Sequence, residues 1–82
     1  MKTDKLLGLA VSKNGFVFDP ENGSSYTLND TGLFILQQIQ SGNDKSAVLE
    51  KMINEYEVTM DLAQSDFEHF VAMLKSLDLV EA

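Results

Sequence analysis

The chain contains no cysteine and no arginine among its 82 residues. The absence of cysteine excludes disulfide bonds, thiolate-bound zinc, iron–sulfur clusters and thiol nucleophiles, although it does not decide the redox compartment. Basic residues are few: the formal net charge is −7, and no two lysines are adjacent. A surface that binds phosphates needs clustered basic side chains. The sequence therefore predicts that neither nucleic acid nor an anionic membrane is a partner.

Long apolar runs are also missing. No stretch approaches the roughly 18 apolar residues of a membrane span. Residues 6–11 form an apolar stretch after a charged segment, but this stretch is too short for the apolar region of a secretion signal, and Asn14-Gly15 follows it. We therefore expect a cytoplasmic protein.

Residues that carry chemistry are sparse as well. His69 is the single histidine, and no second ligand is spaced from it as a metal site requires. Ser24 and Ser25 lack a nucleophile-elbow sequence and a nearby base, and the glycines fit no phosphate-binding pattern. The acidic residues are scattered over predicted polar faces and helix caps, whereas acid–base catalysis needs carboxylates in differing, partly buried surroundings. The sequence predicts a binding module with no catalytic activity, no metal and no cofactor.

The chain does contain enough apolar residues for one core. Hydrophobic residues make up 44% of the sequence, and a chain of this length buries roughly 60–65% of its unfolded surface. We expect a single domain spanning residues 1–82. Its acidity has two explanations that the sequence leaves open, namely solubility and attraction to a basic peptide or a basic enzyme surface.

The amino-terminal third is predicted to form an antiparallel meander of three strands. The strands are expected at residues 6–11, 16–18 and 24–28. Residues 14–15, Asn-Gly, predict a hairpin with a type I′ turn, in which both central residues need a positive φ. Residues 19–23, DPENG, predict the second turn.

Three amphipathic helices are predicted after the meander. The first is capped by Asn29 or Asp30 and ends at residues 41–42, and the second is capped by Ser46 or Asp44.

The third helix is expected from near Thr59 to about Leu77, and the apolar tail Leu79-Val80 is expected to fold back onto the core. The predicted buried faces consist of Leu33, Phe34, Leu36 and Ile39; Leu49, Met52, Ile53 and Tyr56; and Leu62, Ala63, Phe67, Phe70, Val71, Leu74 and Leu77. Together these elements predict an α+β domain, a winged helix-turn-helix with the three-stranded meander as its wing.

Two stretches, LNDTGLFILQQIQSGNDKSAVLEKM at residues 28–52 and SDFEHFVAMLKSLDLVE at residues 65–81, resemble the PqqD family of small peptide-binding proteins. The residues that match the family pattern, in order, are Leu28-Asn29, Thr31-Gly32, Ile35, Gly42, Ser46, Leu49, Asp66, Phe70, Leu74 and Leu79-Val80. One departure is Asp78, which stands where the family commonly has glycine. Aspartate tolerates left-handed backbone better than most residues, so we expect the turn to survive.

The resemblance implies a function as well as a fold. Family members look like winged helix-turn-helix domains that bind the leader segment of a ribosomally made precursor peptide and present it to a modifying enzyme, often a radical S-adenosylmethionine protein. The leader is taken to add as an extra strand to the third strand, beside the last helix, and the family is not catalytic. Two other functions share this architecture: a winged-helix DNA-binding regulator, which should carry a basic recognition helix, and an adaptor that dimerises through its own sheet edge. We expect a monomer or a weak homodimer.

The predicted third strand is suited to such a role, because it carries no charge and no proline to guard its edge. Uncharged side chains beside free N–H and C=O groups favour the addition of a peptide strand. The alternative is that a dimer partner or a loop covers this edge. The predicted peptide-binding residues are Ser25, Tyr26, Thr27 and Leu28 on the strand, with Asp66, Phe70 and Met73 on the third helix.

Overall fold

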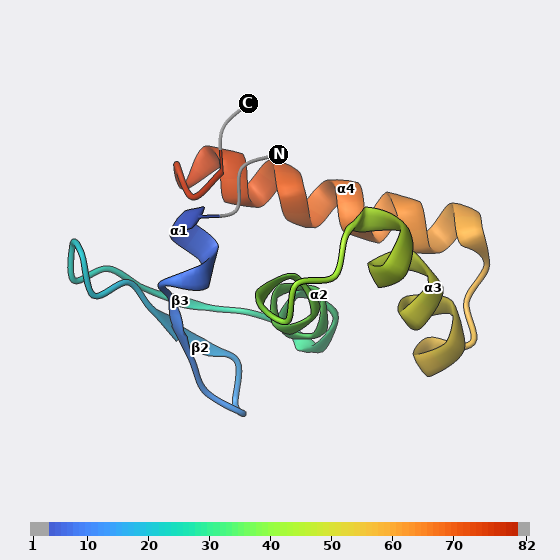
Figure 1. The fold of residues 1–82 in the computed structure, drawn as a ribbon, viewed down its shortest axis with the longest axis horizontal. Helices are drawn as coiled ribbons and strands as arrows, with labels where there is room; N and C mark the ends of the chain where they lie inside the picture. The colour runs from blue at the N-terminus through green and yellow to red at the C-terminus, as the bar shows by residue number, and fades with distance from the viewer. Residues whose placement is uncertain (1–3, 81–82) are drawn as a thin grey trace.

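The computed structural model, which describes residues 4–80, contains the predicted three-stranded meander followed by the three predicted helices, but a short helix takes the place of the first part of the first expected strand (Figure 1). The elements in chain order are α1 (Asp4–Leu7), β1 (Ala10–Val11), β2 (Phe16–Phe18), β3 (Ser25–Thr27), α2 (Asp30–Gln40), α3 (Lys45–Tyr56) and α4 (Met60–Ser76). The predicted domain of residues 1–82 includes residues 1–3 and 81–82, which lie outside the described residues.

The amino-terminal segment differs from the prediction, because the strand expected at residues 6–11 is replaced by α1 and the two-residue strand β1. This segment lacks a strict alternation of apolar and polar residues, and a helical turn buries Leu6 and Leu9, three residues apart, while Leu7 stays 55% exposed. The Gln40 side chain on α2 donates hydrogen bonds to the carbonyl oxygens of Leu6 and Leu9, at 2.8 and 3.1 Å. These bonds fasten the segment to α2.

The sheet has the order β1-β2-β3, and both strand pairs are antiparallel, so β1 and β3 are its two edges. The prediction of a type I′ turn between β1 and β2 was wrong. Gly15 has a φ of 87°, but Asn14 does not have a positive φ. The Gly15 N–H donates to the Ser12 carbonyl oxygen at 3.2 Å, and a three-residue loop that ends in a left-handed glycine is typical of a G1 bulge.

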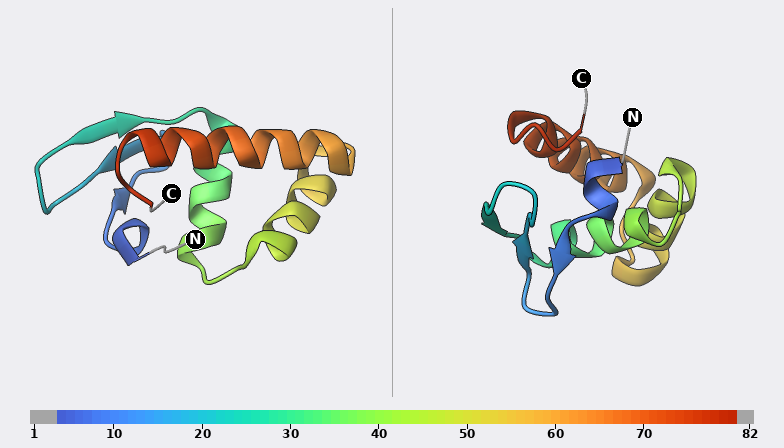
Figure 2. Two further views of the ribbon diagram at one scale, coloured as in Figure 1. Left: turned by 90° about the horizontal axis from the view of Figure 1, so that it is seen from above. Right: turned by 60° about the vertical axis from the view of Figure 1, so that its left-hand side comes forward.

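Helices α2 and α3 lie on the same side of the long helix α4, and the sheet lies toward the carboxyl-terminal end of α4 (Figure 2). All three helices begin with side-chain caps: Asn29, Asp44 and Thr59 accept hydrogen bonds from backbone N–H groups in the first turns of α2, α3 and α4. Of the two candidates offered for each of the first two helices, the structure therefore selects Asn29 and Asp44. No helix within residues 4–80 is long and apolar enough to cross a membrane.

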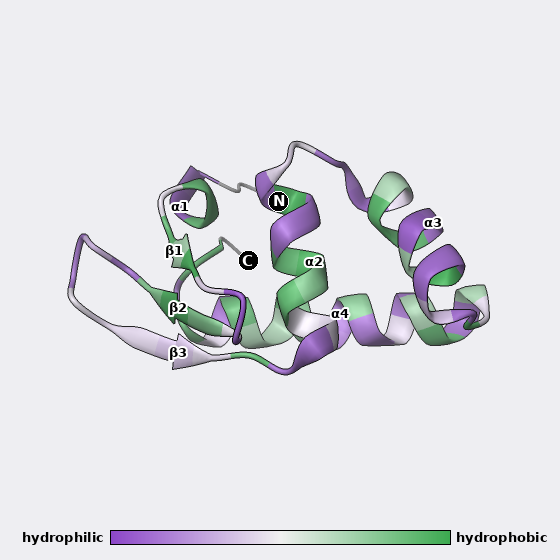
Figure 3. Cartoon of the chain, turned by 90° about the horizontal axis from the view of Figure 1, so that it is seen from below, coloured by the Kyte–Doolittle hydropathy of each residue, from purple (hydrophilic) through white to green (hydrophobic). Residues whose placement is uncertain are grey.

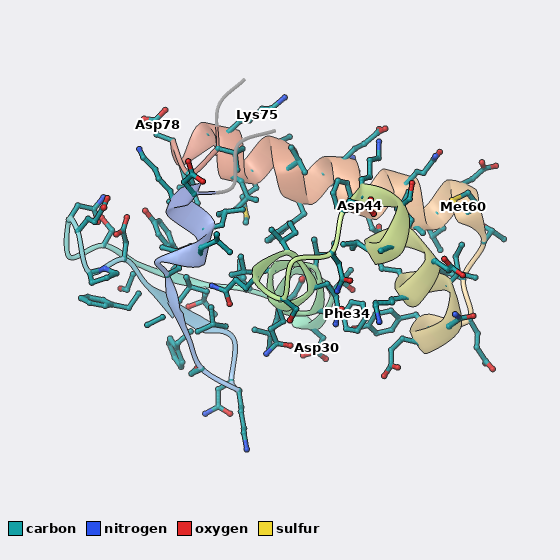
Figure 4. All side chains as sticks on the ribbon, viewed as in Figure 1. Asp30, Phe34, Asp44, Met60, Lys75 and Asp78 are labelled. Carbon is teal, nitrogen blue, oxygen red and sulfur yellow. The ribbon has the colours of Figure 1, made fainter. Side chains whose placement is uncertain are left out.

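The core gathers residues from α1, the sheet and the three long helices. Its members are Leu6, Leu9, Val17, Ile35, Leu36, Ile39, Val48, Leu49, Met52, Ala63, Phe67, Phe70, Leu74, Leu79 and Val80. The burial predicted for Leu62 and Tyr56 was wrong, because these side chains are 49% and 38% exposed. Phe34 is half-buried and packs edge-to-face on Tyr56, at 5.4 Å between ring centroids, which joins α2 to α3 (Figure 4).

The carboxyl-terminal tail folds back as predicted, and Leu79 and Val80 are 4% and 7% exposed. Asp78 takes the left-handed conformation expected of it, with a φ of 58°. The Leu79 N–H donates to the Leu74 carbonyl oxygen at 2.9 Å, which is the long bond of a Schellman motif at the end of α4. Asp78 lies at this turn (Figure 4), and its carbonyl oxygen accepts a hydrogen bond from Lys5 Nζ at 3.1 Å.

Candidate functional site

The backbone of β3 has one bonded side and one outward side. The Leu28 N–H donates to the Gly15 carbonyl oxygen at 2.8 Å, just beyond the end of β3. Bonded and outward positions alternate along an antiparallel strand, so Tyr26, two residues earlier, also bonds to β2. The N–H and C=O groups of Ser25 and Thr27 therefore point away from the sheet.

This outward side of β3, which we call the β3 edge, pairs with no other strand within residues 4–80. Side chains alternate along the strand: Ser25 and Thr27 are exposed, whereas Tyr26 and Leu28 are half-buried. In the hydropathy colouring β3 is pale while β2 is strongly apolar (Figure 3). The backbone remains extended at Asn29, with φ −74° and ψ 175°, before α2 begins. Within residues 4–80 the strand edge is thus uncharged and unpaired.

A groove of about 370 Å³ lies beside the carboxyl-terminal end of β3, between the first turn of α2 and one face of α4. It is lined by Thr27, Leu28, Asn29, Thr31, Gly32, Ile35, Asp66, His69, Phe70 and Met73. The groove and the β3 edge share Thr27, so an extended peptide beside β3 would place side chains in the groove.

Five of the seven predicted site residues come together in this groove: Thr27, Leu28, Asp66, Phe70 and Met73. The other two lie elsewhere on β3. Tyr26 lines a small apolar space next to Met73 and Leu77, and Ser25 borders a hollow on the opposite face of the sheet. Phe70 is only 6% exposed, so it belongs to the core and to the groove wall at once.

The prediction missed five residues of the groove: Asn29, Thr31, Gly32, Ile35 and His69. His69 could have been found from the helical period, because it follows Asp66 by three residues and precedes Met73 by four, which places all three on one face of α4. The sequence reading treated His69 as a solvated surface residue, and it is exposed, but it is exposed within the groove.

Gly32 controls how closely α2 approaches α4. A Cβ at this position would lie 3.2 Å from Phe70 Cε1 and 3.3 Å from Phe70 Cδ1. It would also lie 3.1 Å from Asn29 Oδ1, which already accepts a hydrogen bond from the Gly32 N–H at 2.8 Å. The Thr-Gly pair in the first turn of α2 therefore lets the Phe70 ring pack against the helix backbone and form the groove wall.

The lining of the groove carries little charge. Asp66 is the single carboxylate among its lining residues, and the lining contains no lysine. Within residues 4–80 no three histidine or acidic side chains gather in a way that could hold a metal ion. The arrangement is suited to contact with an extended chain: backbone groups on one side, apolar side chains on the floor and polar side chains at one end.

Comparison with known proteins gives two findings. The family model described as coenzyme PQQ synthesis protein D (PqqD) matches residues 15–80. A solved structure, "Lasso peptide synthetase B1 complexed with the leader peptide", is similar at a TM-score of 0.69 and 30% sequence identity, over 83% of this chain and 81% of that chain. Comparison with curated proteins gave no match.

Proposed function

The chain belongs to the PqqD family, and on this premise we propose that it binds the leader segment of a ribosomally made precursor peptide as an added strand on β3. The bound leader is presented to a modifying enzyme, which the family resemblance suggests is a radical S-adenosylmethionine protein. The protein acts without catalysis, metal or cofactor, in the cytoplasm, as one domain that is a monomer or a weak homodimer. The similar solved structure is that of a protein complexed with a leader peptide, which supports the peptide part of this proposal.

The observation that carries the proposal is the outward direction of the Ser25 and Thr27 backbone groups beside the groove. An added strand would meet two N–H and two C=O groups there. Each backbone hydrogen bond contributes about 0.5–1.5 kcal/mol net, so four bonds supply about 2–6 kcal/mol. Association costs at least about 4 kcal/mol in lost freedom of motion. Backbone pairing alone is therefore too weak, and the groove must supply the remaining affinity and the selectivity.

The pleat of the sheet decides which leader side chains enter the groove. Leader residues opposite Ser25 and Thr27 would place their side chains on the exposed face of the sheet, as those two residues do. The leader residues between and after them would face the same way as Tyr26 and Leu28, toward α4. The proposed recognition thus uses every second leader residue for side-chain contacts.

A scan of backbone methylation tests this proposal. Peptides that bind the full chain are first selected from a displayed library of random peptides. Each amide nitrogen of one selected peptide is then methylated in turn, and binding is measured by calorimetry. Strand addition predicts that affinity falls at least about tenfold, or about 1.4 kcal/mol, at alternate positions only. Methylation that weakens binding at no position, or without a two-residue period, would contradict strand addition, as would a library that yields no binder.

A further inference from the structure

The α4 face that lines the groove beside β3 changes from apolar to polar along the helix. Along the α4 face that lines it, Met73 and Phe70 are followed toward the start of the helix by His69 and Asp66. Met73 also contacts the apolar space under the sheet, with Leu28. A peptide strand that passes along α4 would therefore meet apolar side chains first and a carboxylate at the far end.

The far end is negative and has no positive lining residue. Asp66 is half-buried, so its carboxylate is partly shielded from water, and a charge opposite it is screened less than one on an exposed surface. Asn29, which also lines the groove, already uses its side-chain oxygen to cap α2. The neighbouring Thr31 and His69 offer polar contacts but no second carboxylate. The charge of the whole chain, −7, acts in the same direction.

From this arrangement, and on the basis of the proposed function, we propose that Asp66 selects leader peptides with a lysine or arginine at a fixed distance from a bulky apolar residue. Asp66 and Met73 are seven residues apart, which is about 10.5 Å along the α4 axis at about 1.5 Å per residue. Two residues of a strand cover about 6.7 Å and four cover about 13 Å. The helical separation falls between these two spans, and residues three apart on a strand face opposite sides. We therefore place the basic residue two or four positions from the apolar residue, with its long side chain covering the difference.

The test compares two removals of one negative charge from α4. Asp66→Asn removes the carboxylate in the groove, and Glu68→Gln removes one that is exposed and does not line the groove. The probe is a selected peptide that contains a basic residue. We expect Asp66→Asn to weaken its binding about tenfold and Glu68→Gln to change it less than about twofold. The Asp66→Lys variant should bind the peptide analogue with glutamate in place of the basic residue better than it binds the original peptide.

Each outcome separates this inference from the proposed function. Equal effects of Asp66→Asn and Glu68→Gln would show that only the overall charge matters, and would overturn the role of Asp66. Selected peptides with no excess of lysine or arginine would overturn it too. If these peptides still show the two-residue period in the methylation scan, strand addition stands and the charge selection alone has failed.

Discussion

The two edges of the sheet differ in length and in surroundings. On β1 the Ser12 N–H donates to the Phe16 carbonyl oxygen at 2.8 Å just past the strand, so Val11 is the single strand residue whose backbone groups point outward. On β3 the outward residues are Ser25 and Thr27, and the chain stays extended to Asn29. β1 follows directly after the turn that ends α1, whereas β3 ends beside a groove.

In our proposal, neighbouring structure, and not side-chain polarity alone, decides which edge can accept a peptide. In the sequence, the first expected strand is flanked by Lys5 and Lys13 and interrupted by Gly8. In the structure the β1 edge is blunted differently, because a helical turn replaces most of the expected strand and Gln40 fastens that turn to α2. A short edge strand is a recognised protection against pairing.

The most direct test of the difference between the two edges is to place the same substitution on both. Thr27→Pro removes an outward N–H from β3 and leaves the bonds to β2 in place, since proline is tolerated where an edge N–H faces solvent. We expect peptide binding to fall at least about tenfold, or about 1.4 kcal/mol. Val11→Pro removes the corresponding outward N–H from β1 and should leave binding within about twofold. Calorimetry with one selected peptide measures both variants.

Two controls accompany this pair. Thr27→Ala removes the side chain but keeps the N–H, so it separates a side-chain effect from a backbone effect. Circular dichroism of each proline variant should match that of the parent chain, because neither change removes a bond between strands. Equal loss of binding in the Val11 and Thr27 proline variants would mean that the edges do not differ as argued.

A smaller effect is expected when alanine replaces one glycine near each edge. At Gly32 the new Cβ would press on the Phe70 ring, so the groove wall must move by a few tenths of an ångström. We expect peptide affinity to fall about threefold to tenfold, or about 0.7–1.4 kcal/mol. The free energy of unfolding should change little, because alanine favours the helix over glycine by up to about 1 kcal/mol and this gain offsets the strain.

At Gly8 the nearest atom to a new Cβ is the Lys5 carbonyl oxygen at 3.7 Å, an ordinary contact distance. Gly8→Ala should therefore leave peptide affinity unchanged. For both variants, chemical denaturation measures the free energy of unfolding and calorimetry measures peptide affinity. An unchanged affinity in Gly32→Ala would show that the Phe70 position does not shape the site.

The smallest effect is expected at the end of α4, on the side of the molecule that holds α1. Asp78→Gly relieves a left-handed conformation that costs a residue with a Cβ about 1–2 kcal/mol, but glycine also loses more freedom on folding. We expect the free energy of unfolding to rise by about 0.5 kcal/mol and peptide affinity to stay constant. Denaturant titration measures the free energy of unfolding, and calorimetry measures the peptide affinity. Asp78→Ala, which lacks both glycine's freedom and the polar side chain, should lower stability.

Local signals in the sequence predicted much of the fold. Asn29 was one of two candidates for the cap of α2, because a short polar side chain there can accept from the first-turn N–H groups, and the start of α4 was expected near Thr59. Asp78 was correctly assigned a left-handed backbone. The first strand was predicted wrongly because the residues around Leu6 fit neither the helical nor the strand period of apolar residues well. Burial of Leu6 and Leu9 against α2 favours a helical turn there.

The candidate site was predicted less completely than the fold. Asp66, Phe70 and Met73 could be found because one helix repeats its face every three to four residues. Gly32 and Ile35 were not found as site residues, because their place in the groove depends on how α2 crosses α4, which no local pattern encodes. The direction of the Ser25 and Thr27 backbone groups also needed the register against β2.

Amide hydrogen exchange, followed residue by residue with NMR in the presence and absence of a selected peptide, tests the claim about the β3 edge most directly. The account predicts that saturating peptide slows exchange of the Ser25 and Thr27 amides at least about tenfold, while Val11 on the other edge is unaffected. Tyr26, already bonded to β2, should change little. A peptide that binds fully and leaves Ser25 and Thr27 exchanging as before would contradict the account.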